Sequence, residues 1–144
     1  MSAMLKTAQQ FLDALQRANL KWKDSRDMDD GNSLVVCGVS GKNNARYDVL
    51  FIFDANGESA AVRVFKLITS CPEDKTLKML DAINDLNNKY RWVKFCLDKD
   101  QDVSVQMDAY VNGDTDGMIC VKLLLRIMKI IDESYPTFMH ILWA

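Results

Sequence analysis

The sequence is poor in the residues that build metal sites and disulfide frameworks. It contains one histidine, His140, and its four cysteines are scattered along 144 residues without a C-x-x-C pair. A zinc site therefore has no support in the sequence. Each cysteine lies in an apolar or turn context, so we expect reduced thiols in a cytoplasmic protein rather than a disulfide framework. His140 lies in an apolar tail without a nucleophile beside it, and we expect a packed or surface residue.

The sequence also lacks the glycine motifs of nucleotide-binding and hydrolytic enzymes. Its six glycines form neither a P-loop nor a dinucleotide fingerprint. The stretch GVSG at 38–41 departs from the G-x-S-x-G nucleophile elbow and is typical of a hairpin turn. Most carboxylates cluster in turns, where solvated side chains are usual. The sequence therefore favours a protein without enzymatic activity, and it indicates no catalytic residue, metal or cofactor.

No stretch is long and apolar enough to predict a membrane span. The most apolar one, residues 118–131, is interrupted by Lys122, Arg126 and Lys129, whereas a span needs about 20 mostly uncharged residues. The N-terminal residues MSAMLKTAQQFLDALQ are too polar for the core of a secretory signal. The formal charge of −2 also disfavours a protein that coats nucleic-acid duplexes, because such proteins are usually basic.

What the sequence does contain is the hydrophobic pattern of one α+β domain over residues 1–144, a length that fits a single core. Segments with apolar residues every three or four positions predict helices, and alternating valine-rich runs between turn clusters predict antiparallel strands. A short edge strand is expected near Trp22. Pro136 disfavours helical geometry in the residue before it and is expected to end the last helix. The predicted elements are a helix at 3–18, strands at 33–40, 45–54 and 58–67, a helix at 70–89, strands at 91–98 and 102–111, and a helix at 115–134.

Aspartates alternate from Asp98 to Asp102 in the stretch FCLDKDQDVSV, which is the spacing of a calcium loop. An EF-hand loop also needs glycine at its sixth position and glutamate at its twelfth, and those places hold Val103 and Ala109. We therefore interpret the aspartates as the turn and polar face of a hairpin, with Asp102 and Asp108 facing water.

The segment INDLNNKYRWVKFCLDKDQDVSV, residues 83–105, resembles the signature region of the YbjN-like family of bacterial sensory transduction regulators. The resemblance lies in a helix that ends in spaced asparagines, Asn84 and Asn87, followed by an aromatic-rich strand and an acidic turn. Upstream, YDVLFIFDANG at 47–57 is similar to the family's middle strand. The resemblance implies a fold similar to type III secretion chaperones, which commonly form homodimers and bind segments of other proteins. It implies no catalytic residues.

The third predicted helix is apolar over most of its circumference. Its polar residues are confined to a narrow stripe formed by Lys122, Arg126, Lys129 and Glu133. A helix that covers one sheet face needs an apolar stripe of only about 100°, and here Met118, Val121 and Leu125 widen it. Either the same chain or a partner covers that flank. Both faces of the central strands are also apolar, which predicts helices on both sides of the sheet or a bound partner.

The segment NKYRWVKF interleaves Lys89, Arg91 and Lys94 with aromatic residues, a composition compatible with stacking on single-stranded nucleic acid. In strand alternation Trp92 and Cys96 share a face that is also suited to a protein partner. The sequence favours the protein partner: a regulator or chaperone-like homodimer that captures a client segment through strand edges or apolar surface. The predicted contact residues are Trp92, Cys96, Met118, Val121 and Leu125.

Overall fold

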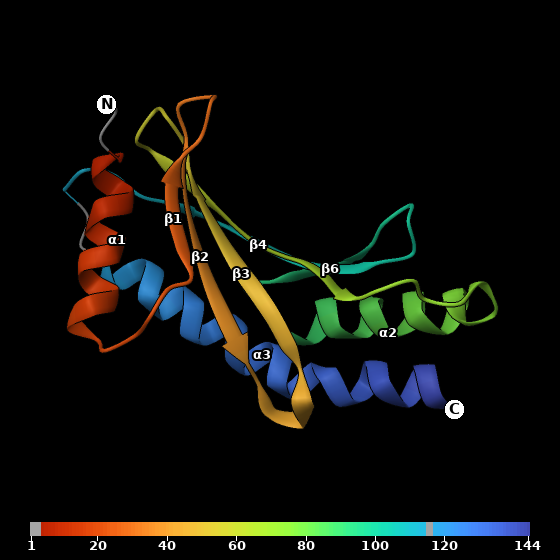
Figure 1. The fold of residues 1–144 in the computed structure, drawn as a ribbon. Helices are drawn as coiled ribbons and strands as arrows, with labels where there is room; N and C mark the ends of the chain where they lie inside the picture. The colour runs from red at the N-terminus through yellow and green to blue at the C-terminus, as the bar shows by residue number, and fades with distance from the viewer. Residues whose placement is uncertain (1–3, 115–116) are drawn as a thin grey trace.

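The computed structural model describes residues 4–114 and 117–144, which form a six-stranded antiparallel sheet and three α-helices (Figure 1). The strands lie in the order β1-β2-β3-β4-β6-β5. The α+β class and the predicted element order are confirmed, although the expected helix starts at residues 3 and 115 lie outside the described residues. The elements are α1 (Lys6–Arg17), β1 (Asp24–Asp27), β2 (Ser33–Ser40), β3 (Arg46–Phe53), β4 (Ser59–Ile68), α2 (Thr76–Lys89), β5 (Lys94–Leu97), β6 (Val103–Tyr110) and α3 (Met118–Trp143), with 3-10 turns at Lys42–Asn44 and Glu73–Lys75.

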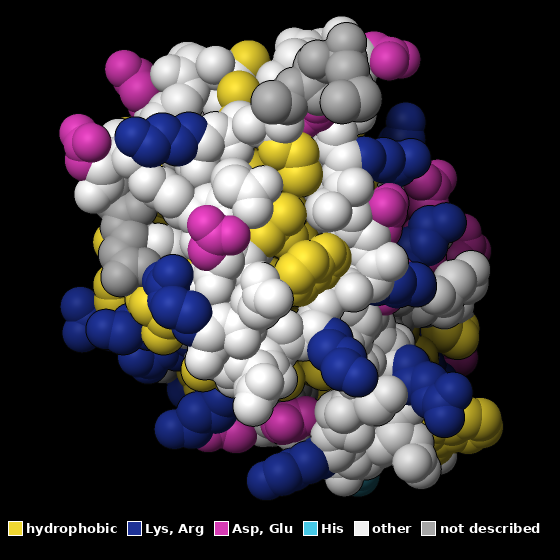
Figure 2. Space-filling model, turned by 60° about the vertical axis from the view of Figure 1, so that its left-hand side comes forward, with side chains coloured by type: hydrophobic (Ala, Val, Ile, Leu, Met, Phe, Trp, Pro, Cys, Tyr) yellow, Lys and Arg dark blue, Asp and Glu magenta, His cyan; other side chains and the backbone are white. Residues whose placement is uncertain are grey.

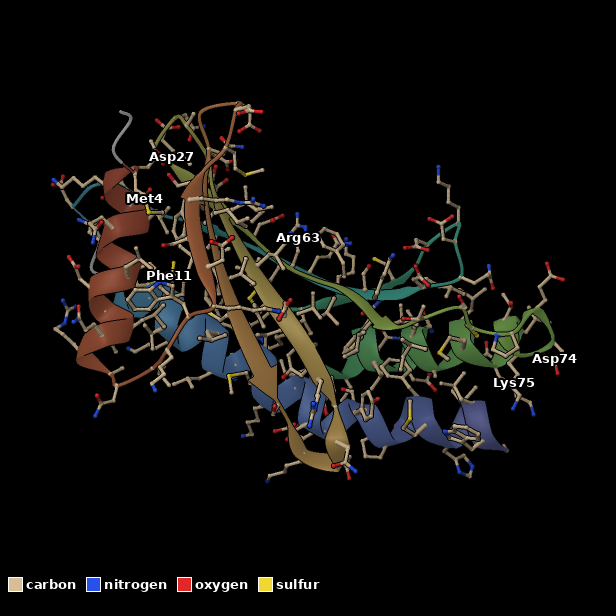
Figure 3. All side chains as sticks on the ribbon, viewed as in Figure 1. Met4, Phe11, Asp27, Arg63, Asp74 and Lys75 are labelled. Carbon is tan, nitrogen blue, oxygen red and sulfur yellow. The ribbon has the colours of Figure 1, made fainter. Side chains whose placement is uncertain are left out.

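The core lies between the helices and one face of the sheet. Phe11 of α1 packs on Phe51 of β3 with ring centroids 4.3 Å apart, and Figure 3 shows this ring pointing from the helix toward the strands. At the other end, Phe138 of α3 packs on Phe95 of β5 with centroids 5.6 Å apart. Helix α3 contacts both α1 and α2, which lie beside its two ends (Figure 1). Its apolar flanks are therefore covered mainly within the chain.

The opposite face of the sheet carries no helix in the described part of the chain. Of the two alternatives for the apolar sheet faces, helices on both sides is therefore wrong, and a bound partner stays a prediction. The strand register places Val36, Leu50 and Arg63 in one row across β2, β3 and β4. Ile52 and Ala61 form part of the neighbouring row. Because directly paired residues of antiparallel strands point to the same face, these side chains lie together. We call this surface the open face. It is defined by four half-buried residues, Val36, Leu50, Ile52 and Ala61.

Helix α3 continues through Pro136 to Trp143, so the expected stop before this proline is wrong. Proline removes one helical hydrogen bond and costs about 3 kcal/mol in a helix interior. Tertiary contacts offset this cost, because the continued helix buries Phe138 in the core. In addition, the Lys75 ammonium donates hydrogen bonds of 2.8 to 2.9 Å to the carbonyl oxygens of Ile141, Leu142 and Ala144. A cation at these carbonyls satisfies acceptors that the last helical turn leaves free.

The β5–β6 hairpin is present, but Asp102 does not face water. Its side chain is 5% exposed, and Oδ1 accepts a hydrogen bond of 2.8 Å from the backbone N–H of Ser70. The Asp98 carboxylate accepts the backbone N–H groups of Asp100 and Asp102 at 2.9 and 3.1 Å. These carboxylates therefore organise backbone in the turn and in the segment before α2, as Asx turns do.

Candidate functional site

The structure separates the five predicted contact residues. Trp92 is 61% exposed in the turn between α2 and β5, and Leu125 is 48% exposed on α3. Met118 and Cys96 are half-buried. Val121 is 1% exposed, so its side chain belongs to the core and offers no contact surface. Trp92 lies near α3, whereas Cys96 lies on the helix-free side of the sheet opposite Ser104, so they do not form one surface.

Trp92 lines a surface hollow of about 430 Å³ between the α2–β5 turn and α3. Four cations line the same hollow: Lys89 at the end of α2, Arg91 in the turn, and Arg126 and Lys129 on α3. Arg126 and Lys129 were not predicted as members of a site, although their place on the narrow polar stripe of α3 was visible in the sequence. We call this site the basic hollow. Its lining residues are Lys89, Tyr90, Arg91, Trp92, Arg126, Lys129, Ile130 and Glu133.

Two contacts fix the walls of the basic hollow. The Tyr90 hydroxyl donates a hydrogen bond of 3.1 Å to Oε2 of Glu133 and so joins the turn to α3. The Lys89 ammonium lies 5.1 Å from the centroid of the Tyr90 ring, which is a cation–π distance. Lys94 is not among the lining residues: it pairs with Gln106 in the row that points to the helix-free side. The predicted trio of Lys89, Arg91 and Lys94 is therefore divided between two faces.

The open face is the second candidate surface, and charged pairs lie on both sides of its aliphatic row. Lys23 and Asp48 form an ion pair of 3.1 Å near β1, and Arg63 and Asp108 form one of 2.9 Å near β6. Figure 3 shows Arg63 on the side of the sheet away from the helices. Hollows of about 460 and 520 Å³ adjoin the row, beside Arg63 and beside Phe65. The open face is thus apolar in the middle and electrically balanced at its borders.

The flank that carries α1 has a different character. Figure 2 shows a narrow strip of hydrophobic side chains at the centre of this flank, surrounded by polar and charged groups. Leu5, Leu20 and Trp22, which precede or follow α1, are half-buried and pack against the core. A narrow strip of this kind is ordinary for a monomeric protein surface. This flank is therefore not a candidate site.

The buried thiols are not candidate nucleophiles. Burial raises the pKa of Cys37 and the pKa of Cys120 to about 12. Burial, reinforced by the charge of Asp74 and opposed by that of Lys75, also raises the pKa of Cys71. Because the thiolate is the reactive form, these raised pKa values disfavour a nucleophilic role for the three thiols at neutral pH. Among the described residues, no group of three or more histidine, cysteine, aspartate or glutamate side chains is placed to hold a metal ion.

Comparison with known protein families shows to which family the chain belongs. The family model YbjN, described as "Putative bacterial sensory transduction regulator", matches residues 7–119, from α1 to the start of α3 and well over half of the chain. The chain belongs to the YbjN family. No curated protein matches the chain. The YbjN match includes Trp92 and the open face but ends before Arg126 and Lys129, so the α3 wall of the basic hollow lies outside the matched region. No helix within residues 4–114 and 117–144 is long and apolar enough to cross a membrane.

One of the two spaced asparagines of the YbjN-like signature, Asn87, has a structural role at the edge of the sheet. Asn87 on α2 donates a hydrogen bond of 3.1 Å from Nδ2 to the Phe95 carbonyl. Its Oδ1 accepts one of 2.7 Å from the Phe95 N–H. The side-chain amide therefore occupies the position of a further strand at β5. The other edge strand, β1, is four residues long and reads DSRD, and short charged edges resist pairing with other chains.

Replacing Asn87 with aspartate is expected to lower the free energy of unfolding by about 2 kcal/mol, since a carboxylate oxygen would face the Phe95 carbonyl without a proton to donate. Urea unfolding measures the change. Asn88→Asp is the matched control, because Asn88 is exposed on the same helix and its substitution is expected to cost within about 0.5 kcal/mol. Equal losses in the two variants would contradict the edge-capping role.

Proposed function

We propose that this YbjN-family protein is a non-enzymatic, cytoplasmic regulator that binds a segment of a partner protein and acts as a chaperone-like homodimer. The open face carries this proposal, because half-buried aliphatic side chains cross the sheet there and no helix of residues 4–114 or 117–144 lies above them. Burial of apolar surface contributes roughly 25 cal/mol per Å². A partner segment that covers Leu50 and Ile52 would gain this contribution.

The borders of the open face support the same proposal. The Lys23–Asp48 and Arg63–Asp108 pairs neutralise the charges next to the aliphatic row. An apolar segment can therefore approach without desolvating an unpaired charge, which is costly. The sheet edges are less suitable than the face, because Asn87 occupies the β5 edge at Phe95. We therefore place the partner segment on the face.

The proposed homodimer uses the exposed part of α3. Leu125 and Ile119 are 48% and 44% exposed, and Met118 is half-buried beside Ile119. Large apolar side chains on the exposed part of one helix are suited to a two-fold contact, in which the same helix of a second copy presents the same residues. The dimer would leave the open face free, because α3 packs on the other side of the sheet.

Co-purification from the cells that make the protein, combined with light scattering of the purified variants, tests both parts of the proposal. Ile52→Lys is expected to lose the bound partner and to keep the dimer. Leu125→Glu is expected to give a monomer. Leu77→Lys, at an exposed position on α2, is the control and is expected to change neither property. Circular dichroism shows whether each variant is folded.

A partner that binds wild type and Ile52→Lys equally would contradict the assignment of the open face. A wild-type monomer at micromolar concentration would contradict the dimer while leaving partner binding intact. A folded protein that enriches no partner at all would remove the proposed function, and the fold and family would stand alone.

A further inference from the structure

We propose that the basic hollow is a binding site for a mononucleotide, a ligand that combines one aromatic base with a phosphate group. This site is separate from the open face, so it does not depend on the proposed function. Its residues come from the end of α2, the α2–β5 turn and α3, and the family match does not reach the α3 residues of the lining.

The cations of the basic hollow supply the phosphate recognition. Lys89 lies at the end of α2 and Arg91 in the turn that follows it, and Arg126 and Lys129 lie on successive turns of α3. All four side chains are exposed, and the chain as a whole carries a formal charge of −2. The hollow therefore gathers positive charge that the rest of the molecule lacks. Guanidinium groups bind phosphate through paired hydrogen bonds, and lysines add attraction as point charges.

Trp92 supplies the base recognition. Its indole ring lines the same hollow and is 61% exposed, so one ring face is accessible for stacking. Its backbone has φ of +81°, a conformation that a bulky side chain rarely adopts. Strained conformations of this kind occur preferentially at ligand sites, where the surroundings hold the residue in place. Here the strained turn presents the only aromatic side chain of the lining other than Tyr90, whose hydroxyl is committed to Glu133.

The shape of the hollow favours a mononucleotide over a nucleic-acid strand. A strand requires cations that follow its backbone over several nucleotides together with several stacking rings. In this structure the four cations surround one hollow of about 430 Å³, a volume typical of small-molecule sites. Lys94 would be the next cation along β5 for a bound strand, but it pairs with Gln106 and points to the other side of the sheet. Glu133 provides an acceptor for amino groups of a base or hydroxyl groups of a sugar.

The hollow also differs from the usual phosphate motifs. P-loops and dinucleotide fingerprints bind phosphate through backbone N–H groups of glycine-rich turns, and the sequence contains neither. In the basic hollow, side chains would make the phosphate contacts. Binding is therefore expected to weaken as salt concentration rises, because exposed charges are screened, and to depend on the individual arginines.

Calorimetric titration at low salt tests the proposal with the 5′-mono- and triphosphates of adenosine, guanosine, cytidine and uridine. At least one of these nucleotides is expected to bind about tenfold more tightly than its nucleoside and than inorganic phosphate. Arg126→Glu is expected to weaken that binding by about tenfold or more. Lys122→Glu makes the same charge change four residues earlier on α3 and outside the hollow, and it is expected to have a much smaller effect. Trp92→Gly suits the positive φ of this position and is expected to keep the fold and to remove the preference over inorganic phosphate.

Three results would overturn the proposal. The first is that no nucleotide in the panel binds. The second is that binding is equally affected by Arg126→Glu and Lys122→Glu. The third is that an oligothymidylate of about 12 nucleotides or a hexaglutamate peptide binds in the hollow while the nucleotides do not, which would assign it to a nucleic-acid strand or to an acidic protein segment.

Discussion

Replacing Phe138 with alanine is expected to lower the free energy of unfolding by about 3 to 5 kcal/mol. The ring is fully buried, and it packs against Phe95 of β5. Its removal would leave a cavity between the last turns of α3 and the sheet. It would also remove the burial that offsets the proline two residues earlier in the helix. Chemical denaturation followed by circular dichroism gives the change directly.

Trp143→Ala is the control for the Phe138 experiment. Trp143 belongs to the same end of α3 but is 84% exposed, and its truncation is expected to change stability by no more than about 0.5 kcal/mol. A loss of similar size in both variants would mean that the segment after Pro136 is not docked on β5. In that case the rule that proline ends the helix would hold in solution.

Replacing Gly117 with alanine is expected to lower the free energy of unfolding by about 3 kcal/mol. An added Cβ at this position would lie 2.8 Å from the Phe11 Cα and closer still to the Gln10 carbonyl, both of which belong to the backbone of α1. Backbone cannot rotate away as a side chain can. Helix α1 would have to move, and this movement would disturb the packing of Phe11 on Phe51.

Gly113→Ala is the matched control, because the nearest atoms to its added Cβ belong to the Lys6 side chain, with Cδ at 3.3 Å. A flexible lysine moves at little cost, so this variant is expected to stay within about 1 kcal/mol of wild type. Urea unfolding of both variants measures the difference. Equal stability of Gly117→Ala and Gly113→Ala would show that α1 does not lie against the start of α3.

The last helix illustrates how local rules fail when distant residues intervene. The sequence around Pro136 contains a correct local signal, because proline does weaken a helix. The compensating groups are Phe95 and Lys75, which precede this position by about 40 and 60 residues in the sequence. Their contacts with α3 are invisible to a rule that considers neighbouring positions. The burial of Asp102 has the same origin, since its partner is the backbone N–H of Ser70.

The candidate sites also combine residues that are neighbours in the sequence with residues from distant elements. Trp92, Lys89 and Arg91 were found because they are close together in the sequence, whereas Arg126 and Lys129 belong to another element. Strand alternation correctly predicted that Lys94 and Cys96 lie on one face. It wrongly predicted the same face for Trp92, because the positive φ of Trp92 is not a strand conformation. Nothing in the local composition required that conformation. The basic hollow was therefore not predictable as a unit.

By itself the sequence determined the α+β class, the order of the elements and the YbjN resemblance, because hydrophobic periodicity and turn residues act within short segments. It also determined that apolar surface exceeds what one helix or one sheet face needs. Only the tertiary structure decided where that surface lies. It packed α1 and α2 against α3, placed no described helix on the open face, and brought four cations to the hollow that Trp92 lines. These outcomes depend on packing between residues far apart in the chain, and packing is decided by the whole fold.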